Sequence, residues 1–380
     1  MSVTLLIFGD ICPDWGFPAL FASGDPEKVF HDILPLIRSA DYAVGNLEAP
    51  ATGSDRKLAK NSVNLKARPS DVALLRDAGF RAFSLANNHI LDYGTEGLKD
   101  TLSLLEQNQL GHYGAGSGEA AAQPHVAVLS GVKVGFLAFA EHEFNCARDY
   151  GAGANLWDDL DGIRAIREAK RSCDYLIVQY HGGIEHYRYP SPVLQKKCRA
   201  MIDAGADFVT CQHSHVIGTR ERWNGGEILY GQGNAVFGHS EARGASWNNG
   251  LICDLELMPG ADGVDSRISY IPITAEPDGE KLAQPPLRDE VLAALEQDSE
   301  KLADEAFIRS GWEAFCKKHA AEYLPMQFGW GLNMTRANRL LKGKLIDLFV
   351  KKNSKRNAMN LIRCDAHREI VTTLLENEFY

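Results

Sequence analysis

Short apolar runs alternate with helix-like segments along the first 275 residues. Runs such as Val3–Phe8, Ala82–Leu85 and Tyr175–Tyr180 have the length and the residue content of buried strands. Between them, segments such as Gly94–Gln107 and Ser191–Ala204 place apolar residues at helical spacing. This alternation predicts an α/β fold with a central sheet and helices on its faces.

Local signals refine this pattern. The runs Val126–Leu129 and Val132–Ala138 flank Ser130-Gly131, a two-residue turn that predicts an antiparallel hairpin and therefore a mixed sheet. The spacing of apolar residues also predicts one helix over Pro26–Ser39. Another helix is predicted over Ser70–Ala78, with its first Ser as the N-cap.

The composition changes near residue 276. The segment Glu276–Leu287 contains three prolines and has the character of a linker. Beyond it, helix formers dominate and strand signals are sparse. We therefore predict one domain over residues 1–275 and a helical extension over residues 286–380.

The extension contains a strongly basic segment. Residues 336–356 include eight Lys or Arg against one acid, Asp347. Apolar residues fall at helical spacing within it, namely Leu341, Leu345, Leu348 and Phe349. A basic amphipathic helix of this kind predicts peripheral contact with an anionic membrane surface. The alternative is a solvated basic face on a packed helix.

Charge and hydropathy exclude some classes of protein. The net charge of −10 argues against a nucleic-acid partner. No apolar stretch approaches the roughly 18–20 residues that a spanning helix needs. The first ten residues lack the basic start of a signal peptide. We therefore expect a cytoplasmic protein that can contact the membrane peripherally.

Histidines follow two of the predicted strands directly. His181 comes after Tyr175–Tyr180, and His213 and His215 come after Ala206–Cys211. Neutral imidazole is the commonest metal ligand, and strand ends hold such ligands rigidly. The pattern therefore predicts a metal site.

Other strand ends supply acids and amides. Asp10 follows the first predicted strand, Glu48 follows the second, and Asn88 follows the third. A mixed set of carboxylate, amide and imidazole ligands suits Mn, Fe or Zn, with one or two cations per chain. Such cations activate water for hydrolysis and hold a phosphoryl oxygen.

Two residues next to these ligands suit proton transfer. His89 lies beside Asn88 and is predicted to protonate a leaving group, with Asp92 orienting its imidazole. The alternative for Asp92 is the N-cap of the helix over Gly94–Gln107.

Four further polar residues are candidates for contact with a small-molecule or polymer-linked anionic substrate: Asn46, Glu185, His186 and Asn234. Alternatives stay open for three of them, and for His186 the alternative is an ordinary loop residue. Glu185 can bind the metal or pair with Arg188, and Asn234 can belong to a tight turn after Gly231-Gln-Gly233.

The order and spacing of these motifs resemble the CapA family of poly-γ-glutamate capsule biosynthesis proteins, within the calcineurin-like metallophosphoesterase superfamily. The resemblance covers residues 4–275 and rests on Gly9-Asp10, Asn46-Leu-Glu48, Asn87-Asn88-His89 with Asp92-Tyr-Gly94, Tyr113-Gly-Ala-Gly116, His181-Gly-Gly-Ile-Glu185, Ile202-Asp-Ala-Gly-Ala-Asp207, His213-Ser-His215 and Gly231-Gln-Gly-Asn234. It implies a four-layer α/β/β/α sandwich. It also implies metal-ligand roles for Asp10, Glu48, Asn88, His181, His213 and His215, and a leaving-group or phosphate-contact role for His89.

One position departs from the superfamily pattern. Classical members begin with Asp-x-His, whereas this chain has Asp10-Ile-Cys12. Whether Cys12 replaces the missing ligand stays open, and so does the number of metals.

The resemblance implies a metal-dependent hydrolase, with phosphoesters as the first expectation and amides as another. It further implies a link to the synthesis of capsule, poly-γ-glutamate or another surface polymer. The alternative is a catalytically weak accessory or binding subunit of a polymer synthase.

Overall fold

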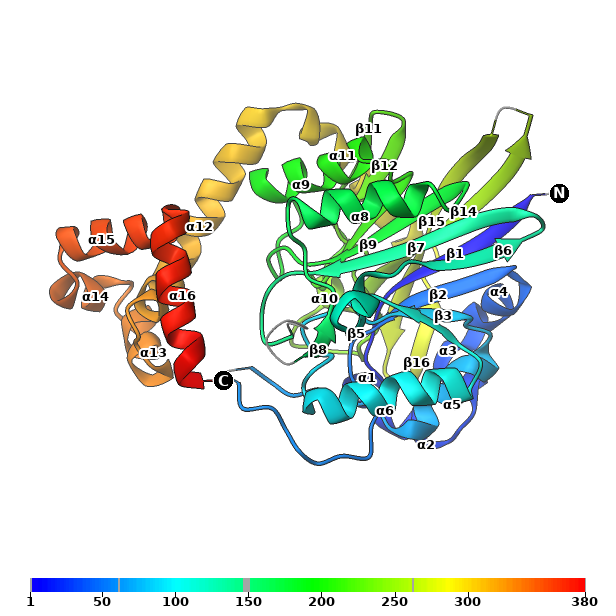
Figure 1. Cartoon of the computed structure of the whole chain (residues 1–380), viewed down its shortest axis with the longest axis horizontal. Coiled ribbons are helices and arrows are strands. Elements are labelled where there is room, and N and C mark those ends of the chain that lie inside the picture. Colours follow the sequence, from blue (N-terminus) through cyan, green and yellow to red (C-terminus); the bar gives the residue numbers. More distant parts are fainter. Residues whose placement is uncertain (1, 61, 146–150, 262, 380) are drawn as a thin grey trace. The chain divides into compact units, whose positions relative to one another are not determined.

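The computed structural model describes residues 2–60, 62–145, 151–261 and 263–379. Contacts divide the chain into two compact units, Met1–Asp304 and Glu305–Tyr380 (Figure 1). The first unit is a mixed α/β structure and the second is helical, so the predicted α/β class is confirmed. The domain boundary predicted between residues 275 and 286 stays a prediction.

The first sheet is built around β1. Its strand order is β16-β15-β14-β1-β2-β3-β4, and β13 pairs with the end of β1. The strands from β1 to β4 are parallel, whereas β14, β15 and β16 run antiparallel to their neighbours. The strands are β1 (Val3–Ile11), β2 (Tyr42–Leu47), β3 (Ala82–Ser84), β4 (Gly111–Tyr113), β13 (Asn234–Val236), β14 (Asn249–Gly260), β15 (Gly263–Glu276) and β16 (Gly279–Leu282).

The second sheet has the order β11-β12-β10-β9-β7-β6. Its four inner strands are parallel, and the predicted hairpin is present as the antiparallel pair β6–β7. The strands are β6 (His125–Leu129), β7 (Val132–Ala140), β9 (Tyr175–His181), β10 (Phe208–Gln212), β11 (Arg220–Trp223) and β12 (Gly226–Leu229). Two short strands, β5 (Ala115–Ser117) and β8 (Ala152–Ala154), form a separate pair.

The two sheets contact each other through aromatic side chains. Tyr42 of β2 and Tyr113 of β4 pack against Phe136 of β7, with ring centroids 5.6 Å and 5.8 Å apart. The Tyr113 hydroxyl also donates a hydrogen bond to Gln179 of β9. Most residues of the inner strands of both sheets are buried, and for this reason the strands are continuous apolar runs in the sequence.

Helices cover the sheets of the first unit. On the second sheet, α8 contacts β7 and β9, and α9 contacts β10 and β12 (Figure 1). The helices are α1 (Pro13–Gly16), α2 (Pro18–Ala22), α3 (Pro26–Phe30), α4 (Leu34–Ser39), α5 (Pro69–Ala78), α6 (Gly94–Gln107), α8 (Asp161–Lys170), α9 (Pro192–Asp203), α10 (Ala245–Asn248) and α11 (Leu287–Glu300).

Two helices differ from their predictions. The helix expected over residues 26–39 is interrupted, because His31 has a φ of 39° and starts a short 3-10 turn between α3 and α4. Helix α5 begins at Pro69, and Arg68 rather than Ser70 is its N-cap. Proline suits the first helical position because it needs no hydrogen-bond partner there.

The second unit consists of α12 (Glu305–Gln327), α13 (Leu332–Leu340), α14 (Lys344–Phe349), α15 (Lys352–Arg363) and α16 (Asp365–Phe379). The single basic helix expected over residues 336–356 is wrong. The chain turns at Lys342 and Gly343, whose φ angles are 53° and 84°, and this turn separates α13 from α14. Among the described residues, none of the helices combines the length and apolarity required to cross a bilayer.

Candidate metal centre

Strand ends bring the predicted ligands to one edge of the sheets. Asp10 on β1 lies in register with Asn46 on β2 and with Asn234 on β13. His181 ends β9 and is in register with Gln212, the last residue of β10 before His213. Because neighbouring parallel strands end at the same edge, residues far apart in sequence meet there.

Two groups of side chains have the spacing of metal ligands. Glu48, His181 and His213 form one group, and Asp10, Glu48 and His215 form the other. Within each group the candidate ligand atoms all lie within 4.8 Å of one another. Glu48 belongs to both groups.

Asn88 joins this cluster through His181. Its side-chain oxygen accepts a hydrogen bond from His181 Nε2 at 3.0 Å. All six predicted ligands are thus buried and gathered in one place.

Glu48 is the least satisfied group of the cluster. Its side chain is fully buried, and within the described part of the chain neither carboxyl oxygen has a hydrogen-bond partner. Burial, together with the negative charge of Asp10, raises the pKa of Glu48 well above its ordinary value. His181 Nε2 and His89 Nε2 lie 3.5 Å and 4.0 Å from its Oε1. A buried carboxyl without a hydrogen bond costs free energy that a bound cation would offset.

Asp10, by contrast, is held as a carboxylate. It accepts hydrogen bonds from Asn46 Nδ2 at 2.8 Å and from the backbone N–H of His213 at 3.0 Å. Burial alone would raise the pKa of Asp10, but His181, His215 and the His213 amide together hold it below its ordinary value.

The two histidines after β10 adopt unusual backbone conformations. His213 has a φ of 83° and His215 a φ of 54°, in the left-handed region that residues other than glycine rarely occupy. Strain of this kind is typical of functional sites. Burial lowers the pKa of both imidazoles, which keeps them neutral and able to bind a metal.

Asparagine amides fix the orientation of several ligands. Asn46 Nδ2 lies 3.2 Å from His181 Nδ1, and Asn234 Oδ1 lies 2.9 Å from His215 Nδ1. Both side chains are buried, and Asn234 also donates to the Trp247 carbonyl at 2.9 Å. Their predicted contact with substrate stays a prediction, whereas their contacts with the ligands are those of positioning residues.

His89 and Asp92 form the predicted pair. His89 Nδ1 lies 2.7 Å from Asp92 Oδ2, and its Nε2 faces Glu48 at 4.0 Å. The N-cap residue of α6 is Tyr93, so Asp92 does not serve as the cap. Asp92 instead accepts from the Leu65 amide at 2.6 Å.

Lys60 completes this pair and was not foreseen. It makes an ion pair with Asp92, and its Nζ lies 3.3 Å from His89 Nδ1. Both charged side chains are about 1% exposed. No sequence signal marks Lys60, because it belongs to a long polar segment between β2 and α5.

Glu143 was also missed. It is exposed in part, yet its Oε2 accepts from Asn88 Nδ2 at 3.3 Å and its Oε1 lies 3.8 Å from His213 Nε2. Asn145 anchors the loop by accepting from the Glu143 amide at 3.0 Å.

Glu185 and His186 lie at the surface next to the site. Both side chains are about half exposed, and they lie 3.8 Å apart. The His186 ring is 6.4 Å from that of His215, which places the pair beside the cluster; its predicted contact with substrate stays a prediction. Arg188, the alternative partner of Glu185, instead pairs with Asp298 at 2.6 Å.

Cys12 lies outside both groups of potential metal ligands found among the described residues. Its side chain is fully buried, and burial raises the pKa of the thiol well above its ordinary value. The thiolate that a metal requires is therefore disfavoured there.

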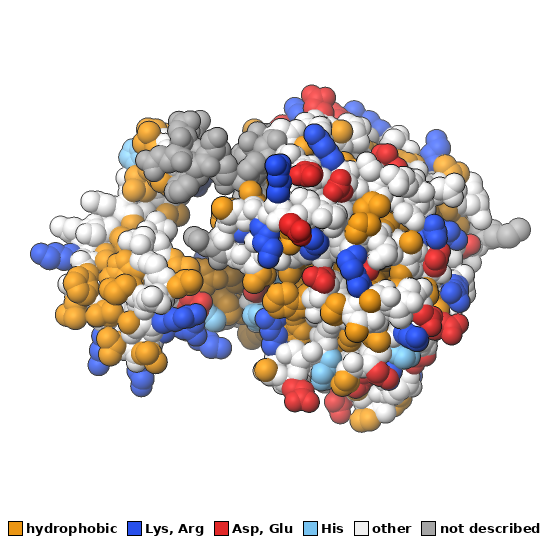
Figure 2. All heavy atoms as spheres, turned by 90° about the horizontal axis from the view of Figure 1, so that it is seen from below, with side chains coloured by type: hydrophobic (Ala, Val, Ile, Leu, Met, Phe, Trp, Pro, Cys, Tyr) orange, Lys and Arg blue, Asp and Glu red, His pale blue; other side chains and the backbone are white. Residues whose placement is uncertain are grey.

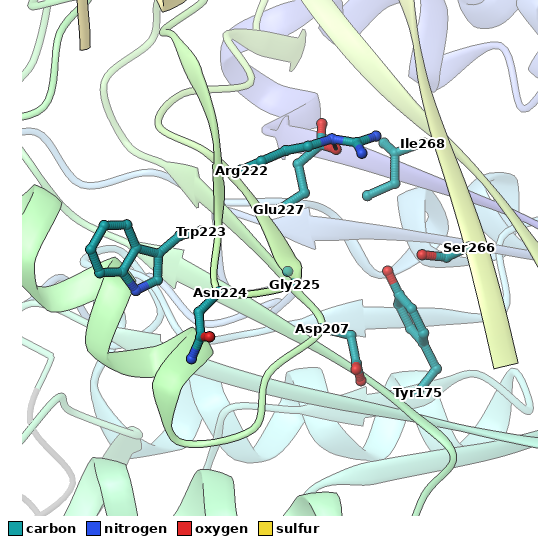
Figure 3. Close-up of a pocket in the computed structure, with 10 residues that line it drawn as sticks. Tyr175, Asp207, Arg222, Trp223, Asn224, Gly225, Glu227, Ser266 and Ile268 are labelled. Carbon is teal, nitrogen blue, oxygen red and sulfur yellow. Dashed lines mark ion pairs between the residues drawn. The ribbon is translucent and has the colours of Figure 1, made fainter. Parts of the chain in front are cut away.

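A pocket lies at the other end of β9 from His181, and Figure 3 shows the residues that line it. It has a volume of about 320 Å³ and is reached by Tyr175, the first residue of β9. Its carboxyl groups already have partners. Asp207 accepts from Lys170 Nζ at 2.7 Å and from the Leu176 amide at 2.6 Å, and Glu227 accepts from the Tyr270 hydroxyl at 2.6 Å. The pocket therefore lacks the unsatisfied carboxyl that characterises the metal centre.

Comparison with known proteins gives a consistent set of relatives. The family model described as "Bacterial capsule synthesis protein PGA_cap" matches residues 4–239. The PGA biosynthesis protein CapA of Bacillus subtilis is 34% identical over 216 residues, which are 56% of this chain and 57% of that protein. The capsule biosynthesis protein CapA of Bacillus anthracis is 30% identical over 253 residues, which are 62% of this chain and 60% of that protein.

A third relative has a different kind of name. A probable polyglutamine synthesis accessory protein of Mycobacterium tuberculosis is 31% identical over 212 residues, which are 52% of this chain and 56% of that protein. This chain therefore spans less than two thirds of the length of each of these relatives.

Proposed function

The chain belongs to the bacterial capsule synthesis protein PGA_cap family, and from this premise we propose that it is a metal-dependent hydrolase, first of all of phosphoesters. We propose that it serves the synthesis of capsule, poly-γ-glutamate or another surface polymer, as the names of its relatives suggest. The observation that carries the proposal is Glu48, a buried carboxyl without hydrogen-bond partners among the described residues that is shared by two groups of potential ligands.

The residues present fit a divalent cation. Carboxylate oxygens and neutral imidazoles suit Mn, Fe or Zn, and two sites that share Glu48 would accommodate one or two ions. The ligands would be Asp10, Glu48, Asn88, His181, His213 and His215. When bound, such cations acidify water and neutralise negative charge on a phosphoryl group.

His89 is the proposed proton donor. Its Nδ1 is held by Asp92, which leaves Nε2 directed toward the cluster; in the imidazolium form, which the Asp92 carboxylate stabilises, Nε2 carries the proton that a leaving oxygen would take, and the imidazole returns to its neutral form. Burial lowers the pKa of His89, although the Asp92 carboxylate opposes this effect. Lys60 fixes Asp92 and therefore acts as a positioning residue.

The proposed substrate is a small anionic molecule or a polymer-linked intermediate. Glu185 and His186 stand at the exposed side of the cluster and would contact it. We also propose that the two facing sheets and their helices form the four-layer α/β/β/α sandwich of the superfamily, which the contacts between β2, β4 and β7 support.

The test is a panel of phosphoesters and γ-glutamyl amides, assayed with Mn, Fe and Zn on the wild type and on Glu48→Gln. Metal-dependent turnover of a phosphoester that the substitution abolishes would support the proposal. Turnover of amides alone would replace the substrate class, and turnover that persists in Glu48→Gln would refute the site.

A second candidate is an accessory subunit of a polymer synthase with little catalysis of its own. Two observations favour it: the buried thiol of Cys12 where the superfamily has a histidine ligand, and the accessory role in the name of one relative. Metal binding without turnover of any substrate in the panel would favour this candidate.

A further inference from the structure

The turn between α13 and α14 exposes apolar and basic side chains together. Leu340, Leu341, Leu348 and Phe349 are 84%, 51%, 76% and 66% exposed. Exposed lysines lie between and after them, at positions 342, 344, 351 and 352. We call these eight residues the C-terminal patch. Figure 2 shows apolar and basic side chains gathered on the helical unit.

The fold of this unit holds the patch outward. Asn338 is fully buried; its Nδ2 donates to the Ala321 carbonyl at 2.9 Å, and its Oδ1 accepts from the Ile346 amide at 2.9 Å. These bonds tie α13 and α14 to α12. Ile346 and Val350 are buried, whereas Leu348 and Phe349 are mostly exposed, although the Phe349 ring also contacts Trp330 with ring centroids 5.9 Å apart.

The charges around the patch have one sign. The only acid in residues 336–356 is Asp347, and Lys355 pairs with it at 2.6 Å. The helical unit as a whole carries 13 Lys or Arg against 8 Asp or Glu, although the full chain is acidic. This local excess of positive charge favours binding to an anionic partner. The negative net charge of the whole chain would not predict such a partner.

The exposed leucine and phenylalanine side chains distinguish a membrane from a soluble polyanion as the anionic partner. A soluble polyanion would pair with the lysines but would leave the apolar side chains in water. An anionic bilayer satisfies both, because its headgroups attract lysines while its interface buries leucine and phenylalanine. We propose that the C-terminal patch docks the protein on an anionic membrane surface. This inference goes beyond the proposed hydrolysis and does not depend on the metal centre.

The test is sedimentation of the full chain with vesicles of phosphatidylcholine, with and without phosphatidylglycerol. Binding is expected only to the anionic vesicles and should weaken at high salt. Replacing Lys342, Lys344, Lys351 and Lys352 by glutamine should lower the binding constant by roughly fivefold for each lysine. Leu348→Ser with Phe349→Ser should lower it by about tenfold or more.

Matched controls come from the other unit. One replaces four exposed lysines by glutamine, namely Lys57, Lys99, Lys133 and Lys196. The other replaces Val128 and Leu160, which are 65% and 82% exposed, by serine. Neither control should change vesicle binding, and circular dichroism verifies that all four variants fold.

Several outcomes would overturn the proposal. One is absence of binding to anionic vesicles, and another is an equal loss in the patch variants and their controls. A third is binding to soluble polyglutamate, used as the probe polyanion, that equals vesicle binding and is insensitive to Leu348→Ser with Phe349→Ser. The double variant His213→Ala/His215→Ala should still bind vesicles, so failure of the metal centre would not be mistaken for failure of the patch.

Discussion

The two ends of β9 carry polar clusters of opposite character. At the end marked by His181, Glu48 is buried without a hydrogen-bond partner among the described residues, and histidines strained at the backbone surround it. At the end marked by Tyr175, the carboxyls of Asp207 and Glu227 accept hydrogen bonds from Lys170 and Tyr270. Buried polar groups without hydrogen bonds are rare in folded proteins and occur mainly where a ligand binds them. The difference in hydrogen bonding therefore distinguishes a functional site from a structural one.

The largest effect is expected when the carboxyl of Glu48 is replaced by an amide, because the difference between the two clusters rests on this group. Glu48→Gln removes the group common to both sets of ligands, so the metal content should fall close to zero. The stabilisation that metal gives the wild type, about 2.7 kcal/mol at a hundredfold excess over Kd, should disappear. Metal analysis and thermal unfolding with and without Mn measure both effects.

The same substitution at the other end provides the control. Glu227→Gln should leave the metal content unchanged and cost about 1 kcal/mol of unfolding free energy, because it weakens the bond from Tyr270. If Glu227→Gln lost metal as Glu48→Gln does, the distinction between the two clusters would fail.

His89→Gln should reduce metal-dependent phosphoester turnover by roughly 10²–10⁴-fold while metal remains bound, because it removes the proton donor without removing a ligand. His239→Gln is the matched variant, since His239 contacts the Ala275 carbonyl at 2.8 Å and has no place in the site. Loss of metal in His89→Gln would make His89 a ligand instead.

Lys60→Met tests the positioning of the pair. Turnover should fall by about tenfold, less than for His89→Gln, because Asp92 loses one of its partners but keeps its bond to His89. Lys60→Arg should recover part of the loss. Unchanged turnover in Lys60→Met would remove Lys60 from the account.

Acid should weaken the metal-free protein through His213 and His215. Burial lowers the pKa of both below the ordinary 6.5, so the unfolded chain binds protons that the folded chain does not as pH falls through that value. The free energy of unfolding should begin to decline as pH falls toward 6.5 and should go on declining below that value, because the folded chain takes up these protons only at lower pH. The decline should be smaller in His213→Ala/His215→Ala, and equal slopes in thermal unfolding would contradict this origin.

Much of the fold and of the candidate cluster could be predicted because strand ends are local in sequence. An apolar run followed by His181, or by His213 and His215, indicates both the strand and the position of the imidazole. Lys60 and Glu143 could not be predicted, because they reach the site from irregular segments whose path depends on tertiary packing. The break after α3 was missed because periodicity does not reveal a positive φ at His31.

The basic segment over residues 336–356 is a second case in which apolar spacing did not reveal a break in a helix. Its charge and apolar spacing were visible, but the spacing predicted one helix where the structure has a turn at Lys342 and Gly343. Asn338 makes this turn through buried hydrogen bonds, which no pattern of apolar residues reports.

The most direct test of the central claim is the metal content of the purified wild type, measured by mass spectrometry beside His213→Ala/His215→Ala. The account predicts about one or two Mn, Fe or Zn ions per wild-type chain and their loss in the double variant. A wild type without metal after incubation with Mn, or a double variant that retains it fully, would contradict the account.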